Sequence, residues 1–174
     1  VRAGDAVIAM ASSGLHSNGY SLVRHVLLNG AKMSLTAHVD DLGRTLGEEL
    51  LEPTKIYAKA CLALAAQTQT HAMSHVTGGG LAANLERVMP AELAATIDRS
   101  TWTRPAIFDL VQRVGGVTTP DLERTLNCGV GMVAMTDADD ADAVIDVLAE
   151  HGVRAWVAGE VHEVGQGRPG GVEV

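Results

Sequence analysis

Residues 5–30 join a short apolar run, a glycine-containing loop and a helical repeat, and this order restricts the fold more than any other part of the sequence. Residues 5–11, DAVIAMA, are almost continuously apolar, which is typical of a buried strand. The loop SSGLHSNG follows, and apolar side chains then recur at helical spacing until Asn29-Gly30 closes the pattern. Asn18 is a favourable N-cap residue for that helix. The stretch therefore predicts a strand–loop–helix junction.

A second junction follows the same plan. Residues 72–77 have the pattern of a strand, Gly78-Gly79-Gly80 forms a loop, and residues 81–89 have a helical pattern. Elsewhere the patterns predict a surface loop at 31–50, with a helical turn near 46–50. Further strands are predicted at 93–97, 131–135 and 154–161. Further helices are predicted at 55–67, beginning close to Pro53, at 106–114, from Thr119 and Pro120 onward, and at 139–150. Together they predict an α+β fold: a mixed β-sheet covered by helices, partly ferredoxin-like.

Size and composition exclude several classes of protein. A chain of 174 residues is long enough to bury one core, so a single domain over residues 1–174 is expected. No apolar run approaches the roughly 18 residues of a membrane span, so no membrane partner is expected. The net charge of −8, with only two Trp, two Tyr and one Phe, argues against nucleic acid as a partner. Cys61 and Cys128 lack CxxC spacing, which is typical of a reducing compartment, and the cytoplasm is the expected location.

The two glycine-rich loops are the candidate ligand-binding elements. Each leads into a helix, so each presents free backbone N–H groups at the positive end of a helix dipole, and a phosphate is the natural ligand for such a loop. A single glycine-rich turn is as readily explained as a tight connection that only glycine can make. Two such loops, with His16, Ser17, Asn18 and Thr77 beside them, favour a binding site.

The first loop has the spacing of a nucleotide-binding P-loop, with Tyr20 in place of lysine. From Gly14 it reads glycine, four residues, Gly19, Tyr20 and Ser21. The P-loop lysine reaches the β- and γ-phosphates, so its replacement by tyrosine argues against a self-sufficient nucleoside triphosphatase. The loop is still suited to a phosphate monoester, or to closing over a substrate whose ATP lies elsewhere.

Single residues offer less specific signals. His16 is a candidate general acid or base because a histidine in a polar loop titrates near neutrality, but a histidine that orders the loop by hydrogen bonding is at least as well supported. On a strand, His71 and His75 are about 13 Å apart, too far to share one metal ion. The acidic residues from Asp137 to Asp142 are better explained by solvation and a helix start than by a cation. No metal site is therefore predicted.

Several stretches together resemble a known family. GDAVIAMASSGLHSNGYSLVR, LLEPTKIYAK, HVTGGGLAANLERVMP, RPAIFDLVQRVGGV, ERTLNCGVGMV and AGEV resemble, in order, the C-terminal half of the aminoimidazole ribonucleotide synthetase family, the phosphoribosylformylglycinamidine cyclo-ligases. The resemblance implies a ligase that uses ATP to close the imidazole ring of formylglycinamidine ribonucleotide in purine biosynthesis. It also implies that ATP and Mg²⁺ are bound mainly by an N-terminal half that is absent here, and that the full-length protein is a homodimer through that half. The start VRAGD, without methionine, fits this expectation.

The resemblance also assigns site residues. His16, the candidate catalytic residue, matches a family motif position. The positions implied for binding substrate or phosphate are Ser13, Gly14, Ser17, Asn18, Gly19, Thr54, Thr77, Gly78, Gly79, Gly80 and Asn84. Three residues depart from the family pattern, namely Glu86, Leu126 and Cys128, and all three are changes of a packing type.

Two alternatives remain open. One is another member of the same ATP-dependent superfamily, of the thiamine monophosphate kinase, selenophosphate synthetase or hydrogenase maturation type. The other is a non-catalytic module that binds a phosphorylated ligand.

Overall fold

A six-stranded sheet is the centre of the protein. The computed structural model describes residues 1–164 and 171–173. The strands are β1 (Asp5–Ala11), β4 (Thr70–His75), β5 (Leu93–Ile97), β6 (Val130–Asp137), β7 (Ala155–Glu163) and β8 (Val172–Glu173), in the spatial order β4-β6-β1-β7-β5-β8. Neighbouring strands are antiparallel except β5 and β8, which are parallel, so the sheet is mixed as the sequence predicted.

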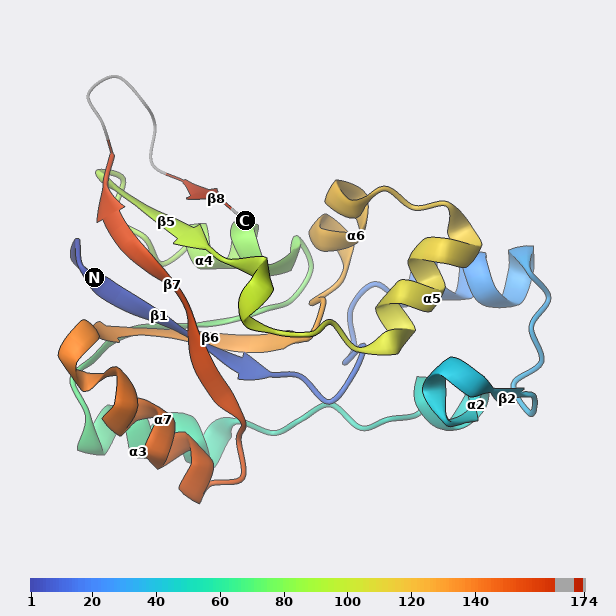
Figure 1. Ribbon diagram of the computed structural model, residues 1–174, viewed down its shortest axis with the longest axis horizontal. Helices are drawn as coiled ribbons and strands as arrows, with labels where there is room; N and C mark the ends of the chain where they lie inside the picture. Colours follow the sequence, from blue (N-terminus) through green and yellow to red (C-terminus); the bar gives the residue numbers. More distant parts are fainter. Residues whose placement is uncertain (165–170, 174) are drawn as a thin grey trace.

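Four adjacent strands of this sheet have the ferredoxin-like topology. Helix α3 (Ala58–Gln67) lies between β1 and β4 in the chain, and helix α7 (Ala141–Glu150) lies between β6 and β7. The four strands β4-β6-β1-β7 then have the order of two interleaved strand–helix–strand units. Both helices cover the same face of the sheet (Figure 1). The partly ferredoxin-like prediction is therefore confirmed.

Alternate side chains of β1 enter two different apolar clusters. Ile8 points toward the face covered by α3 and α7, where it joins Leu64 and Leu148. Val7 points to the opposite face and joins Leu85 of helix α4 (Gly80–Glu86). Because successive side chains of a strand point to opposite faces, one apolar strand supports both layers. This double burial explains why residues 5–11 are almost continuously apolar.

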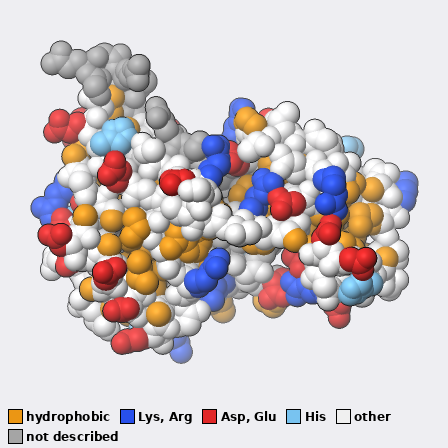
Figure 2. Space-filling model, in the orientation of Figure 1, with side chains coloured by type: hydrophobic (Ala, Val, Ile, Leu, Met, Phe, Trp, Pro, Cys, Tyr) orange, Lys and Arg blue, Asp and Glu red, His pale blue; other side chains and the backbone are white. Residues whose placement is uncertain are grey.

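A helical lobe extends from one end of the sheet. It contains α1 (Tyr20–Val23), which continues as a π-helix, η1 (Arg24–Gly30), and also α2 (Leu46–Leu50), α5 (Ala106–Gly115) and α6 (Thr119–Thr125). Its own apolar cluster surrounds the fully buried Phe108. Figure 1 shows this lobe beside the sheet, and Figure 2 shows a narrower waist between the two parts. Charges of both signs are interspersed on the face seen in Figure 2.

Three short helical turns and a small hairpin complete the description. The 3₁₀ turns are η2 (Asp40–Leu42), η3 (Arg99–Thr101) and η4 (Ala138–Asp140), and the hairpin pairs β2 (His38–Val39) with β3 (Arg44–Thr45). Within the described residues, no helix has both the length and the apolar character needed to cross a bilayer.

The first helix differs from its prediction at both ends. Its N-cap is Gly19 and not Asn18, and no side chain caps the helix. A residue that caps a helix with its side chain has an extended backbone, whereas Gly19 has a left-handed backbone with φ 77°. Beyond Val23 the hydrogen bonds skip one more residue, as in the bond from the Ala31 N–H to the Val26 carbonyl. The predicted α-helix is therefore mostly a π-helix.

Other boundaries also shift. Helix α3 begins at Ala58, so Pro53 lies well before it in an irregular segment and not at its start. The predicted surface loop at 31–50 contains the β2–β3 hairpin, and β8 was not predicted. Strand β5 matches its prediction residue for residue. The unpredicted strands β2, β3 and β8 have two residues each, too few for an alternating pattern to show.

Candidate substrate-binding site

Both glycine-rich loops lie at the same end of the sheet. Loop 12–19 follows β1, and loop 76–79 follows β4. Both strands are antiparallel to β6, which lies between them, so they run in the same direction and their ends meet. Segment 126–129, which leads into β6, reaches the same end. The tertiary structure thus brings together the two loops that the sequence singled out.

A fourth segment, residues 51–57, lies against loop 12–19. The Ser13 hydroxyl donates to the Pro53 carbonyl at 2.6 Å. The hydroxyls of Ser17 and Thr54 lie 3.0 Å apart and are hydrogen-bonded. Three of the predicted site residues are therefore neighbours in space, although Thr54 is far from the loop in the chain.

His16 is built into loop 12–19. It is only 5% exposed and has a left-handed backbone, with φ 59°. Its Nε2 accepts a hydrogen bond from the Ser13 N–H at 3.1 Å, so the neutral ring carries its proton on Nδ1. That Nδ1 is buried and has no partner among the described residues. Burial, reinforced by His75 and Lys55 nearby, lowers the pKa of His16 and keeps the ring neutral.

Tyr57 packs against His16 and stabilises the start of the same loop. Its hydroxyl donates to the Ala11 carbonyl at 2.7 Å, at the point where β1 ends. Its ring centre lies 6.1 Å from that of His16 and 6.4 Å from that of His75. Burial raises the pKa of Tyr57 far above its ordinary value, so the hydroxyl stays protonated and remains a donor. Tyr57 lies in the stretch LLEPTKIYAK and matches the family motif there, but the sequence analysis did not assign it to the site.

Asn84 organises the triple-glycine loop. Its side chain is 2% exposed, and its Nδ2 donates to the carbonyls of Gly80 at 2.7 Å, Thr77 at 3.2 Å and Gly78 at 3.3 Å. Its Oδ1 accepts from the Thr77 hydroxyl at 3.0 Å and from Arg87. These bonds use the whole amide, so Asn84 shapes the loop, and the surface that the loop offers is mainly backbone.

The two loops have unused hydrogen-bond donors. Among the residues that the structure describes, the peptide N–H groups of the following have no protein acceptor: Ser17, Asn18, Gly19, Gly78 and Gly79. Peptide N–H groups and hydroxyls suit an oxyanion such as a phosphate ester, and the two carboxylates beside Gly14, those of Glu49 and Glu52, are both paired with Arg44. The donor set therefore fits the ligand that the sequence predicted.

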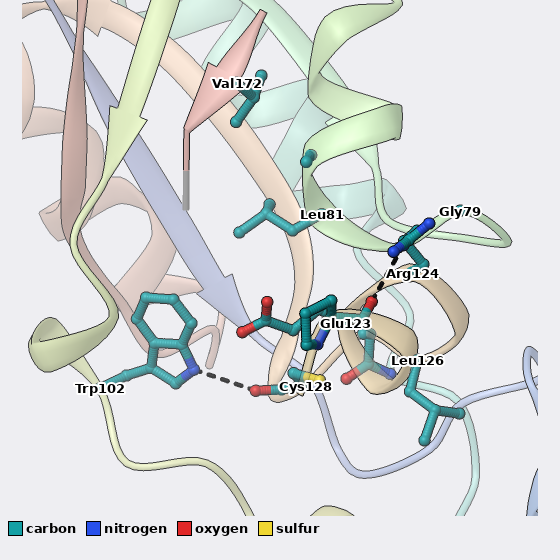
Figure 3. A pocket seen from close by; sticks show the side chains of 11 residues that line it. Gly79, Leu81, Trp102, Glu123, Arg124, Leu126, Cys128 and Val172 are labelled. Atoms are coloured by element: carbon teal, nitrogen blue, oxygen red, sulfur yellow. Dashed lines mark hydrogen bonds between the residues drawn. The ribbon is translucent and has the colours of Figure 1, made fainter. Parts of the chain in front are cut away.

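A cavity of about 220 Å³ borders the triple-glycine loop between α4 and α6. Figure 3 shows Leu81, Val172 and the Trp102 ring around it, with the Glu123 carboxylate at its side. The Trp102 indole N–H donates to the Cys128 carbonyl at 3.0 Å, which fixes the ring as a wall. The lining is mostly apolar, so the cavity adds shape and apolar contact beside the polar loops.

A second polar cluster lies at the opposite end of the sheet. His71 Nδ1 is 2.8 Å from an oxygen of the buried Asp5, and Asp137 lies beside them, so the three side chains have the spacing of a metal site. The Arg2 guanidinium, however, donates to both oxygens of Asp137. An arginine thus already supplies positive charge there, and we assign no metal. The sequence patterns missed this cluster because its members are 66 or more residues apart.

The fold is shared with a protein of known structure. Thiamine-monophosphate kinase from Stenotrophomonas maltophilia has a similar structure, with a TM-score of 0.62 and 20% identity, and the comparison covers 98% of this chain and 50% of that one. At this identity the likeness shows the fold alone. The chain is thus an α+β domain of the kind found in that kinase.

The sequence comparisons identify the family. Residues 2–170 match the family described as AIR synthase related protein, C-terminal domain, and the chain belongs to it. A Streptomyces fradiae protein with the provisional name phosphoribosylformylglycinamidine cyclo-ligase is 59% identical over 95% of this chain and 91% of its own length. A phosphoribosylformylglycinamidine cyclo-ligase of Sorangium cellulosum is 49% identical over 95% of this chain, which spans 48% of that protein. The resemblance inferred from the sequence motifs is confirmed.

Proposed function

We propose that this chain forms the ribonucleotide-binding side of a phosphoribosylformylglycinamidine cyclo-ligase, the ligase that uses ATP to close the imidazole ring of formylglycinamidine ribonucleotide in purine biosynthesis. The identity of 59% to a protein with that provisional name supports the activity. The observation that carries the binding role is the set of free peptide N–H groups that the two glycine-rich loops present at one end of the sheet. A ribose phosphate is the part of this substrate that such donors recognise.

Loop 12–19 binds its ligand through hydrogen bonds and not through a positively charged side chain of its own. Tyr20, which stands in the lysine position of a P-loop, donates its hydroxyl to the Leu50 carbonyl at 2.6 Å and so points away from a ligand on the loop. Lys55, in the neighbouring segment, donates to the Gly152 carbonyl at 2.9 Å. A monoester phosphate held by N–H groups and hydroxyls needs no lysine, whereas transfer from a triphosphate does.

The residues described here do not provide a site for ATP with Mg²⁺. Near the glycine-rich loops, Glu49 and Glu52 are both paired with Arg44, at no more than 2.7 Å, so neither carboxylate is free for a cation. The Asp5, His71 and Asp137 cluster lies at the far end of the sheet. We therefore propose that ATP and Mg²⁺ are held mainly by another part of the natural protein, through which it dimerises, and we derive no step through the ion.

His16 remains the proposed catalytic residue, and its neutral ring carries the proton on Nδ1. The neutral ring offers Nδ1–H as a donor that no described residue uses, while Nε2 stays bound to the Ser13 N–H. A neutral histidine can donate a hydrogen bond from Nδ1–H to a substrate atom that reaches it, and so stabilise charge that develops on that atom. If His16 only orders the loop, its removal weakens substrate binding and leaves the chemical step intact.

The assay is ring closure in the natural protein that carries this chain. Wild-type protein with ATP and formylglycinamidine ribonucleotide is expected to form aminoimidazole ribonucleotide, ADP and phosphate. The His16→Ala variant is expected to lower kcat and to change the pH profile of kcat. A raised KM with unchanged kcat would assign His16 to loop order. Ring closure by residues 1–174 alone would contradict the division of the active site.

A non-catalytic phosphate-binding module is the alternative that one observation favours, because no lysine or free carboxylate lies on the two loops. Binding of the ribonucleotide by the natural protein without ATP-dependent ring closure would establish that alternative.

The cytoplasm is the proposed location, since both cysteines, Cys61 and Cys128, are free thiols.

A further inference from the structure

One segment of the chain, residues 123–129, contacts both glycine-rich loops. A Cβ on Gly19 would lie 2.1 Å from Leu126 Cδ2 and 3.0 Å from the Thr125 carbonyl. A Cβ on Gly80 would lie 1.6 Å from the Glu123 carbonyl oxygen. Both glycines are therefore required by the close approach of this segment as well as by their positive φ. The end of α6 and the turn after it act as a common support for the two loops.

Asn127 is the residue of this segment that fixes loop 12–19. Its Nδ2 donates to the Gly14 carbonyl at 2.9 Å and to the Leu15 carbonyl at 3.1 Å. Its Oδ1 accepts from the Ser12 hydroxyl at 3.0 Å and from the Gly129 N–H at 2.8 Å. These four bonds use every hydrogen-bonding position of a primary amide.

The same side chain also stabilises its own turn. Cys128, the next residue, has φ 49°, a left-handed conformation that is rare for residues other than glycine. The bond from the Gly129 N–H to Asn127 Oδ1 closes the turn around it, and the Ser12 N–H donates to the Gly129 carbonyl at 2.9 Å. The turn and the first half of the loop are thus locked together through one amide.

We infer that Asn127 is a positioning residue for substrate binding: it holds the buried Gly14 and Leu15 of loop 12–19 so that the residues after His16 present the N–H groups of Ser17, Asn18 and Gly19 to the phosphate of the ribonucleotide. Asn127 lines the cavity beside the triple-glycine loop, but it is only 5% exposed and its amide is fully bonded within the protein, so its polar atoms act on the loop and not on the ligand. The inference rests on the proposed function for the identity of the ligand, because the free donors by themselves specify only an oxyanion.

The geometry argues for positioning over simple stability. Both carbonyls that Asn127 holds belong to residues 14 and 15, and the free donors begin two residues later at Ser17. If the bonds from Asn127 to the carbonyls of residues 14 and 15 are lost, the loop still has its N–H donors, but these donors no longer point toward one ligand position. Because a preorganised set of donors binds an anion without an ordering cost, this loss appears first in substrate affinity.

The test compares Asn127→Asp with Thr136→Val in the natural protein. Asn127→Asp retains both acceptor bonds but places a carboxylate oxygen against the Gly14 and Leu15 carbonyls. Thr136 is fully buried in β6, and its hydroxyl donates to the Gln69 carbonyl at 3.3 Å toward the opposite end of the sheet, so Thr136→Val matches the loss of a buried hydrogen bond away from the loops. Thermal unfolding gives the stability of each variant.

Two readouts are measured on both variants. The first is the split between KM and kcat for ring closure: Asn127→Asp is expected to raise KM for the ribonucleotide at least tenfold and leave KM for ATP within twofold, whereas Thr136→Val changes neither. The second is amide NMR with inorganic phosphate as the probe. Phosphate is expected to shift the amide signals of Ser17, Asn18 and Gly19 in the wild type and not in Asn127→Asp.

The outcomes separate this inference from the proposed function. If the wild type does not close the ring, the proposed function fails, and the phosphate titration still decides the role of Asn127. Unchanged KM and unchanged phosphate shifts in Asn127→Asp overturn the inference. Equal effects of the two variants, in proportion to their loss of stability, also overturn it, because Asn127 would then be a structural residue only.

Discussion

The Tyr57 hydroxyl occupies the space that a side chain at Gly131 would need. A Cβ on Gly131 would lie 2.0 Å from Tyr57 Oη and 2.7 Å from His16 Cε1. The hydroxyl at that position donates to the Ala11 carbonyl, where β1 passes into loop 12–19. The absence of a side chain on β6 therefore allows a tyrosine and a histidine from other segments to meet beneath the loop.

Substitution Gly131→Ala is expected to destabilise the protein by displacing Tyr57. Overpacking of a filled core costs about 1–3 kcal/mol, and the added methyl group also breaks the hydrogen bond to Ala11. Urea unfolding measures the change. Gly78→Ala is the control, since a Cβ at Gly78 meets nothing within 4 Å and its φ lies outside the left-handed region. Equal stability of the two variants would show that Tyr57 moves without cost.

The lowered pKa of His16 predicts a loss of stability in acid. Below the ordinary value near 6.5, the unfolded chain binds a proton at this residue while the folded protein does not, so the free energy of unfolding falls as pH decreases. One proton contributes up to about 1.4 kcal/mol per pH unit. His16→Asn removes the titration, and asparagine tolerates the left-handed backbone.

Chemical unfolding between pH 7 and pH 5 checks this prediction. The His16→Asn variant is expected to lose less stability over this range than the wild type. Parallel curves for the two proteins would mean that the folded and unfolded states bind the proton at His16 equally.

Substitution Gly79→Val is expected to weaken ribonucleotide binding at least tenfold. Gly79 has φ 101°, and its N–H has no acceptor among the described residues, so a branched side chain there strains the loop and blocks close approach of a phosphate. Isothermal titration with the ribonucleotide measures the effect. Gly4→Val carries a similar backbone strain, at φ 90°, just before β1 and so at the opposite end of the sheet from the loops. If both variants bind equally well, Gly79 does not contribute to the site.

Cys128 is expected to resist alkylation in the folded protein. Burial raises the pKa of its thiol to about 12, and the thiolate is the reactive form. At pH 8 this lowers the thiolate fraction by a factor on the order of 10³ relative to an ordinary thiol. Peptide mapping after iodoacetamide treatment, with and without urea, measures the reactivity. Rapid labelling of Cys128 without urea would contradict the packed environment.

Local patterns predicted most of the elements. Strand β5 needed only an apolar run of the right length, and helix α5 needed only apolar residues at helical spacing. The first helix was predicted less well, because the close approach of Leu126 to Gly19 belongs to a distant segment. A cap depends on the conformation of one residue, and here a tertiary contact sets that conformation.

The candidate site divides in the same way. The glycine-rich loops, His16 and Thr54 were predicted from residue types and from the family motifs. Asn127, Tyr57 and Gly131 were not included, since an amide, a tyrosine and a glycine carry no signal until their partners are known. The role of Tyr57 comes from a contact with Ala11, 46 positions away, and that of Asn127 from contacts with loop 12–19 up to 115 positions away.

The sequence by itself determined the alternation of strands and helices, the two loops with free N–H groups and the family, because apolar period, turn residues and motifs act over a few neighbouring positions. The tertiary structure alone decided that both loops meet at one end of the sheet and are supported by the same turn. That outcome depends on β6 pairing between β1 and β4, which is a long-range choice. Local physical preferences do not encode such a choice, and only the packing of the whole chain selects it.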